Sequence, residues 1–256
     1  MDDSILLRYN RQIMMTEFGI EGQQRIMDSA VLVVGLGGLG SAVTMYLAGS
    51  GVGHLVLNDF DTVDLSNLQR QIVHSSQSVG ISKVESAIQT LTALNHEIKI
   101  TGIDRKLSGS ELYDQVQSVA VVVDATDNFD IRFALNEASV ATRTPLVSGA
   151  AIRMDGQFAV YRPDLGDSPC FRCLYAAEDE PVERCSETGV LGSVCGTIGS
   201  LQATEVLKII AGVGTSAHGK LFLYDASRLE WQEVTIPKDR RCPVCSSVVS
   251  AATAAG

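Results

Sequence analysis

Four glycines placed between an apolar run and a helical pattern give the first sign of chemistry in this sequence. They are Gly35, Gly37, Gly38 and Gly40. They follow the apolar run at 30–34, and three of them match the spacing G-x-G-x-x-G. In a strand-turn-helix, this spacing lets backbone N–H groups and a helix amino terminus face phosphate groups. Asp59 ends the next apolar run, where an acid can accept from ribose hydroxyls. The stretch predicts a nucleotide site, with close strand-helix packing as the alternative role for the glycines.

A polar loop and the start of the next helical pattern supply candidate contacts to that nucleotide. We expect them from Asp61, Asn67, Arg70, Gln71 and Lys83. Arg70 and Lys83 favour ATP over NAD. A triphosphate under attack develops charge that cations stabilise, whereas backbone N–H groups usually satisfy the pyrophosphate of NAD. The alternative for both cations is an ordinary solvated surface charge.

Acidic residues end the apolar run at 119–125, in the sequence DATDN. Asp124, Asp127 and Asn128 stand where ligands bind in open α/β sheets, at the carboxyl end of a strand. Mg²⁺ takes one or two carboxylates together with phosphate oxygens. The motif therefore predicts magnesium beside ATP, and the alternative is that Asp127 or Asn128 only caps the following helix.

Two C-x-x-C pairs predict a metal site. The four cysteines are Cys170, Cys173, Cys242 and Cys245. Four thiolates in two such pairs are typical of tetrahedral Zn²⁺. A redox C-x-x-C needs only one pair and leaves the other unexplained. Because four thiolates leave no open position, we expect the zinc to be structural.

Two further cysteines differ in their surroundings. Cys185 lies in an acid-rich stretch that is typical of an exposed loop, and Cys195 has small apolar neighbours. An exposed thiol is available for chemistry, whereas a buried one is usually inert. Neighbouring acids raise the pKa of Cys185 and Arg184 lowers it, so the sequence leaves its reactivity open.

The elements around these motifs predict an α/β fold. Strands are expected at 30–34, 54–59, 97–103, 119–125 and 145–150, and helices after the glycines, over 80–95 and over 136–144. Apolar strands separated by helices are typical of a doubly wound, mostly parallel Rossmann-like sheet. Beyond residue 150 we expect antiparallel strands at 156–163, 220–226 and 229–236, interrupted by a helix over 197–212. Residues 247–256 are expected to form a flexible tail.

Composition sets limits on partners and location. The chain has 256 residues, of which 45% are hydrophobic, and a formal net charge of −10. This balance disfavours a nucleic-acid surface, which needs clustered Lys and Arg. The amino terminus carries acids where a secretory signal carries bases, and we expect neither a membrane segment nor a membrane partner. The expectation is a cytoplasmic protein.

The motifs taken together resemble a known family. The stretches RYNRQI, GLGGLG, DFDTVDLSNLQRQ, DATDN and SGAAIRMDGQ, with the paired cysteines, are similar to the MoeB/ThiF adenylyltransferases, relatives of ubiquitin-activating enzymes. The resemblance runs from about residue 8 to 246. It implies one adenylation domain over 1–246, with a nucleotide-binding half at 1–150 and a carrier-binding and zinc half at 151–246.

The resemblance also implies a reaction. A homodimer binds Mg-ATP and a small ubiquitin-like sulfur-carrier protein with a C-terminal Gly-Gly, whose carboxylate attacks the α-phosphate and releases pyrophosphate. Asp59 is then expected at the ribose and Asp127 at the magnesium. Asn67, Arg70 and Lys83 are expected at the phosphates. Arg11 is expected to reach the ATP of the partner subunit, and its alternative is a plain surface arginine.

The identity of the carrier stays open. SGAAIRMDGQ is closer to the molybdopterin branch, whose carrier is the small subunit of molybdopterin synthase, and the thiamine-thiazole carrier is the alternative. Cys185 matches a cysteine implicated in joining the carrier to the enzyme, but it does not distinguish the branches. Sulfur is expected from a separate donor, a cysteine desulfurase or rhodanese. The alternatives from other classes are an NAD-dependent dehydrogenase and a non-catalytic scaffold.

Overall fold

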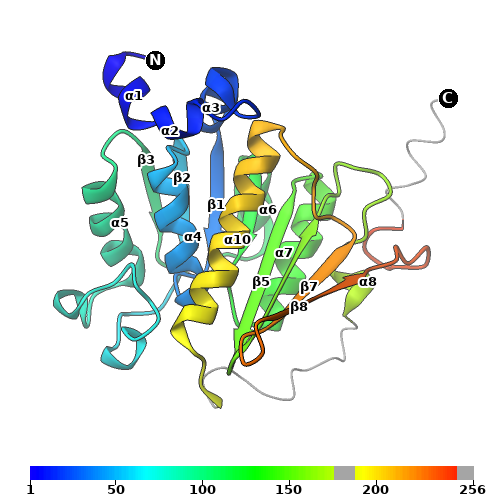
Figure 1. The fold of residues 1–256 in the computed structure, drawn as a ribbon. Helices are drawn as coiled ribbons and strands as arrows, with labels where there is room; N and C mark the ends of the chain where they lie inside the picture. Colours follow the sequence, from blue (N-terminus) through cyan, green and yellow to red (C-terminus); the bar gives the residue numbers. More distant parts are fainter. Residues whose placement is uncertain (176–187, 247–256) are drawn as a thin grey trace.

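One mixed eight-stranded sheet organises the protein, whose computed structural model describes residues 1–175 and 188–246 (Figure 1). The strand order is β3-β2-β1-β4-β5-β6-β7-β8. The strands are β1 (Ala30–Val34), β2 (His54–Asn58), β3 (Lys99–Ile103), β4 (Val121–Asp124), β5 (Leu146–Ile152), β6 (Asp155–Tyr161), β7 (Lys220–Asp225) and β8 (Glu230–Thr235). The first five in this order run parallel and the last three antiparallel, as the sequence predicts.

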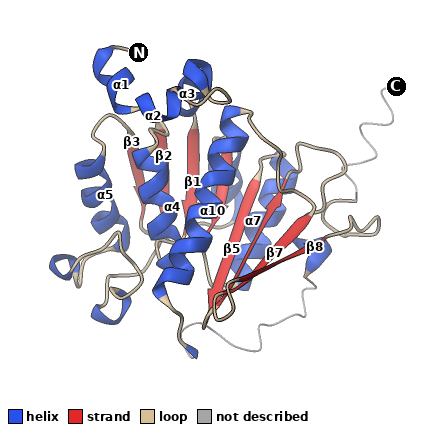
Figure 2. Cartoon of the chain, in the orientation of Figure 1, coloured by secondary structure: helices blue, strands red, loops and turns tan. Residues whose placement is uncertain are grey.

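Helices cover both faces of the parallel part (Figure 2). They are α1 (Asp3–Arg8), α2 (Asn10–Ile13), α3 (Gly19–Met27), α4 (Gly38–Gly49), α5 (Lys83–Leu94), α6 (Gly109–Gln117), α7 (Phe129–Thr142), α8 (Phe171–Leu174) and α10 (Gly192–Ala211), with short 3-10 turns at Leu65–Asn67 and Ser76–Ser78. Side chains alternate across each strand, so β1 supplies two cores. Val31 and Val33 pack with α4, α5 and α10, and Leu32 and Val34 pack with α6 and α7.

The helices depart from the sequence prediction in two ways: α1, α2, α3 and α8 were not predicted, and α6, α7 and α10 differ as follows. α7 begins seven residues earlier than expected, and α10 begins at Gly192 rather than 197. The glycines of α10 lower its helix propensity but permit close packing: a Cβ on Gly199 would lie 2.5 Å from the Leu39 carbonyl oxygen of α4. The expectation also omitted α6, which buries only Leu112 and Val116 and so carries a weak apolar pattern.

α10 is also the one helix among residues 1–175 and 188–246 that is long and apolar enough to cross a membrane. Half of its apolar window is buried, and the helix packs against α4, β5 and β6. Its hydrophobicity is accounted for by its place in the core.

The turn from β1 into α4 is very tight. Gly35 has φ +93°, which favours glycine, and a Cβ there would lie 2.7 Å from the Ala125 carbonyl oxygen. A Cβ on Gly40 would lie 1.9 Å from the Gly35 carbonyl oxygen. The backbone of the turn therefore leaves no room for side chains at these two positions.

We predict that Gly40→Ala lowers the free energy of unfolding by about 1–3 kcal/mol, because the added methyl group meets backbone that cannot move aside. Gly49→Ala is the matched control in the same helix, since a Cβ there has nothing within 4 Å. It should leave stability unchanged or raise it by up to about 1 kcal/mol. Urea unfolding measures both, and equal stability of Gly40→Ala and wild type would contradict the packing described for this turn.

Candidate functional site

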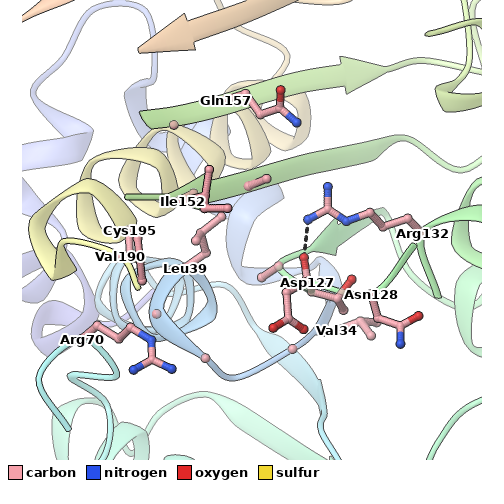
Figure 3. Close-up of a pocket in the computed structure, with 18 of the residues that line it drawn as sticks. Val34, Leu39, Arg70, Asp127, Asn128, Arg132, Ile152, Gln157, Val190 and Cys195 are labelled. Carbon is pink, nitrogen blue, oxygen red and sulfur yellow. Dashed lines mark hydrogen bonds between the residues drawn. The ribbon is translucent and has the colours of Figure 1, made fainter. Parts of the chain in front are cut away.

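A cavity of about 900 Å³ opens at the carboxyl ends of the parallel strands. It is within the size range of small-molecule sites and lies where open α/β sheets bind ligands. Its lining combines the glycine turn, the ends of β2 and β4, the start of α5 and parts of β5 to β8. In Figure 3, Arg70 lies on one side of this cavity and Asp127, Asn128 and Arg132 on the other.

The glycine side of the cavity has the features of a nucleotide cradle. Gly35, Gly37 and Gly38 line it, and α4 begins at Gly38, so its free N–H groups face the cavity. Gln71 is buried in the same wall, and its Oε1 has no hydrogen-bond partner among the described residues. An unsatisfied buried oxygen beside a side-chain-free turn fits a polar ligand there.

The predicted cations reach the same wall. Lys83, the first residue of α5, is 6% exposed, and its Nζ lies 2.8 Å from Asp61 Oδ2. Arg70 Nη1 donates to the Ser66 carbonyl oxygen at 3.2 Å. Asn67 also lines the cavity. Asp61 thus holds the Lys83 ammonium at the cavity wall, and an acid beside a phosphate is more useful as a partner of the lysine than as a phosphate contact.

Asp59 fastens the glycine turn to the end of β2. Its Oδ2 accepts from the Leu36 backbone N–H at 2.7 Å, and its Oδ1 accepts from the Asp61 backbone N–H at 2.9 Å. The residue lines the cavity and is 9% exposed. Each carboxylate oxygen has two lone pairs, so the predicted contact with a ribose remains compatible with these bonds.

The three polar residues of DATDN have three different environments. Asp124 is 1% exposed and accepts from Thr126 N–H and Oγ1 and from Ser148 Oγ, so its oxygens are not available to a metal. Asn128 caps α7, because its Oδ1 accepts from the Ile131 N–H at 3.1 Å. Asp127 is exposed at the cavity, which leaves it as the carboxylate that can take a cation.

Arg132 is a site residue that the sequence analysis missed. It is 4% exposed and donates through Nη2 to the carbonyl oxygens of Thr126 and Gly149, while its Nε lies 3.7 Å from Asp124 Oδ2 (Figure 3). It therefore fixes the loop that carries Asp127. The sequence did carry a signal for this residue: Arg132 is a charged residue directly after Ile131, in the helix that follows DATDN.

The far wall of the cavity comes from the second half of the chain and was also missed. Gln157 Nε2 donates to Tyr175 Oη at 3.0 Å, and both residues line the cavity with Ala150, Ala151 and Gly156. These three small residues leave room for an extended ligand beside the nucleotide side.

His74 connects the glycine turn to α5, the two elements that face the phosphates in the predicted site. Its Nε2 lies 3.0 Å from the Leu36 carbonyl oxygen in the glycine turn, and its Nδ1 lies 2.9 Å from Ser86 Oγ in α5. The pKa of His74 is lowered from 6.5, mainly because the ring is buried and also because Lys83 lies nearby. The hydrogen bond to Leu36 and the charge of Asp59 act in the opposite direction and raise the pKa, but they do not outweigh burial. The imidazole is neutral in this position.

The four paired cysteines come together as predicted, in a cluster that could hold a metal ion. All four sulfur atoms lie within 4.8 Å of one another. Bonds of about 2.3 Å from zinc to sulfur place tetrahedral sulfurs about 3.8 Å apart. The Cys170–Cys242 and Cys173–Cys245 separations are 3.7 and 3.5 Å.

The thiol pKa values show why a cation suits this cluster. Without a metal, the hydrogen bond from Cys170 lowers the pKa of Cys173 to about 5, while burial and the neighbouring sulfurs raise that of Cys245 to about 12. Several thiolates so close together repel one another unless a cation lies between them.

Three residues singled out in the sequence remain: Cys185, Cys195 and Arg11. Cys185 falls outside the described residues. Cys195 is 2% exposed but lines the cavity, where its Sγ stands 2.8 Å from the position of a Cβ on Gly38. Arg11 is exposed in α2, next to the carboxyl end of α4, and does not line the cavity.

Comparison with known proteins gives one consistent group. The sequence profile of the ThiF family matches residues 9–244. The chain is 47% identical to the molybdopterin-synthase adenylyltransferase of Escherichia coli (strain K12), over 96% of this chain and 98% of that protein. It is 42% identical to the sulfur carrier protein ThiS adenylyltransferase of the same strain, over 96% and 97%. A crystal structure of E. coli MccB with MccA-N7isoASN has the same fold, with a TM-score of 0.83, 23% identity and coverage of 93% of this chain and 74% of that one.

We predict that His74 makes the protein less stable in mild acid. Because its pKa is lowered in the folded chain, the unfolded chain binds more protons once the pH falls below about 6.5. Stability should therefore decrease from pH 6.5 downward until the folded form is also protonated. His74→Gln should reduce the loss between pH 7.5 and 5.5 by up to about 1.4 kcal/mol, the limit for one group over one pH unit.

Urea unfolding at the two pH values checks this prediction. His96→Gln is the control, because His96 is exposed on the surface. His54, whose pKa burial also lowers, leaves a residual slope in both variants. The same pH dependence in His74→Gln as in wild type would show that His74 does not cause it.

Proposed function

The chain belongs to the ThiF family, and from this premise we propose that it is an adenylyltransferase that uses ATP to activate the C-terminal glycine carboxylate of a small ubiquitin-like sulfur-carrier protein. The observation that carries the proposal is the meeting of the glycine turn, Arg70, Lys83 and Asp127 around one cavity. A dehydrogenase would leave Lys83 and Asp127 without a role.

The chemistry needs charge neutralisation and alignment. A carboxylate oxygen of the carrier attacks the α-phosphorus of ATP, the bond from that phosphorus to the bridging oxygen breaks, and pyrophosphate leaves. Both reactants are anions, so Arg70 and Lys83 stabilise the charge that develops on the phosphates. Asn67 and the N–H groups of the glycine turn orient the phosphates, and Asp59 the ribose.

Asp127 is the residue that would hold magnesium. Bound there, magnesium would add to the charge neutralisation that Arg70 and Lys83 supply to the triphosphate. Arg132 and Asp124 hold the loop that presents Asp127, as their bonds to Thr126 and Gly149 indicate.

The wall formed by Gln157, Tyr175 and the small residues of β5 and β6 is where we place the carrier's Gly-Gly tail. A tail without side chains can lie along the cavity wall at Ala150, Ala151 and Gly156, where β5 and β6 pair and present only small residues. The molybdopterin synthase small subunit is our first choice of carrier and the thiazole carrier the second. Cys185 is the residue we assign to the link between carrier and enzyme: its thiolate would attack the carbonyl carbon of the acyl-adenylate and form a thioester as AMP leaves, and sulfur would then come from a separate cysteine desulfurase or rhodanese.

Arg11 acts in a second copy of the chain. α4 has twelve residues and spans about 18 Å, with the glycine turn at one end and the Arg11 segment at the other. Arg11 therefore lies too far from the nucleotide of its own chain.

The apolar residues exposed near Arg11 and near the cavity support a symmetric dimer. Leu7, Met14 and Ile20 are exposed in the segment that carries Arg11, and Phe60, Leu65 and Ile72 are exposed in the loop that carries Arg70. In a two-fold dimer, one patch can cover the other on the partner, which would bring Arg11 to the partner's phosphates.

Zinc in the cysteine cluster completes the proposal. Phe171, between Cys170 and Cys173, packs against Phe129 and Tyr175, and both of these line the cavity. The metal would thus brace the wall that receives the carrier. Such a thiolate site persists in the reducing cytoplasm, where we place the protein.

Exchange of labelled pyrophosphate into ATP tests the reaction. We predict exchange that depends on a carrier with a free Gly-Gly end, faster with the molybdopterin synthase small subunit than with the thiazole carrier. Lys83→Met should reduce the rate by about 10²-fold or more, because a charge contact to the phosphates is lost. Lys99→Met is the control, since Lys99 is exposed at the start of β3. No exchange with either carrier, in protein that still binds Mg-ATP, would overturn the proposal.

Metal analysis tests the zinc. We predict one zinc per chain, lost in Cys245→Ser and retained in Cys195→Ser, which replaces a buried cysteine outside the cluster. Loss of metal should lower Tm by at least about 6 °C, because a structural zinc contributes several kcal/mol to folding. Equal zinc content and Tm in the two variants would contradict a structural zinc at these cysteines.

A further inference from the structure

The segment that carries Arg11 has one buried anchor. α1 and α2 are six and four residues long and bury none of their side chains. Helices this short are not stable by themselves. Tyr9, between them, is 3% exposed and is the only buried residue among residues 1–20. The position of Arg11 therefore depends on what Tyr9 contacts.

Tyr9 fits against the carboxyl ends of α4 and α5. A Cβ on Gly51, which follows α4 with φ +82°, would lie 2.4 Å from Tyr9 Cζ, so the ring lies directly on the glycine backbone. Asn95, the C-cap of α5, is fully buried and donates to Tyr9 Oη at 2.9 Å and to the Ala48 carbonyl oxygen at 2.8 Å.

Gln12 adds a second anchor on the other side of Arg11. Its Nε2 lies 2.6 Å from Gln23 Oε1 and 3.2 Å from the Ser50 carbonyl oxygen, which also accepts from Gln23 Nε2 at 3.0 Å. Gln23 is fully buried. Arg11 lies between the two anchors, and its side chain is exposed and makes no hydrogen bond or ion pair with another described residue.

These contacts give α4 and α5 two functional ends. Their amino ends carry Gly38 and Lys83, which face the chain's own nucleotide cavity. Their carboxyl ends hold Tyr9. We propose that Tyr9, packed on Gly51 and hydrogen-bonded to Asn95, is a positioning residue. It fixes the segment that carries Arg11, and Arg11 in turn acts at the nucleotide site of the partner subunit. This inference rests on the proposed function, with Arg11 acting across the dimer.

Mixed dimers test the inference, because they show which site a residue serves. Two differently tagged full-length chains are co-expressed, the mixed dimer is purified through both tags, and pyrophosphate exchange is measured. In a dimer of Tyr9→Ala with Lys83→Met, one site keeps its lysine and receives Arg11 from the chain whose Tyr9 is intact. We expect this dimer to regain about half of the wild-type rate, although Tyr9→Ala homodimers fall about tenfold or more.

The reverse arrangement should give the opposite result. When Tyr9→Ala and Lys83→Met are on one chain and the other chain is wild type, the only site with a lysine receives Arg11 from the unanchored segment. We expect exchange at about half the rate of the Tyr9→Ala homodimer, because only one of the two sites keeps its lysine. If Tyr9 merely stabilised its own chain, this dimer would keep half of the wild-type rate and the first would not recover, which would overturn the inference.

Two further pairings separate the inference from the function on which it rests. A mixed dimer of an Arg11→Ala chain with a Lys83→Met chain should also regain about half of the wild-type exchange rate. If this dimer stays inactive, Arg11 does not act across the dimer and the proposed function is wrong on that point. Gln12→Ala keeps the Tyr9 ring buried and serves if Tyr9→Ala does not fold; it should follow the same pattern as Tyr9→Ala. Tyr113→Ala, at an exposed tyrosine of α6, should change nothing in either arrangement.

Discussion

The close approach of backbone to backbone where β1 turns into α4 is the constraint on which the rest of the structure depends. At Gly35 and Gly40 the chain leaves no space for a Cβ, and the Asp59 carboxylate holds the Leu36 N–H of the same turn. This contact sets where α4 begins, and the amino end of α4 in turn defines the phosphate-facing wall of the cavity. His74, between the Leu36 carbonyl oxygen and Ser86, passes the same constraint to α5 and so to Lys83.

Buried polar contacts on the protein side of the cavity wall fix the position of the charged group at Asp127. Asp124 and Arg132, both almost fully buried, form hydrogen bonds with the backbone N–H and carbonyl oxygen of Thr126 and leave Asp127 exposed at the cavity. Asp61, an exposed acid at the cavity wall, holds the buried Lys83 side chain through an ion pair. A site built in this way can lower the barrier for reaction between two anions, because its charges are already oriented before the substrates bind.

Contacts outside the cavity lie at the carboxyl ends of α4 and α5 and at the cysteine cluster. α4 and α5 have their amino ends at the nucleotide cavity and their carboxyl ends around Tyr9, and the cysteine cluster braces the opposite wall through Phe171. Phe171 therefore links the cysteine cluster to the cavity of its own chain, whereas Tyr9 lies at the opposite ends of α4 and α5 from that cavity. A dimer in which Arg11 crosses to the partner would join two such sites into one catalytic unit.

The sequence by itself determined the elements whose signals are local. Apolar runs ending in polar residues located the parallel strands and their carboxyl ends, the glycine spacing located the nucleotide turn, and the two C-x-x-C pairs located the cysteine cluster. Only the tertiary structure decided which acid of DATDN is free, that Arg132 lies in the cavity and that Tyr9 anchors the Arg11 segment. These depend on contacts between residues far apart in the chain, such as Tyr9 with Asn95 and Arg132 with Gly149, and no local pattern encodes such pairs.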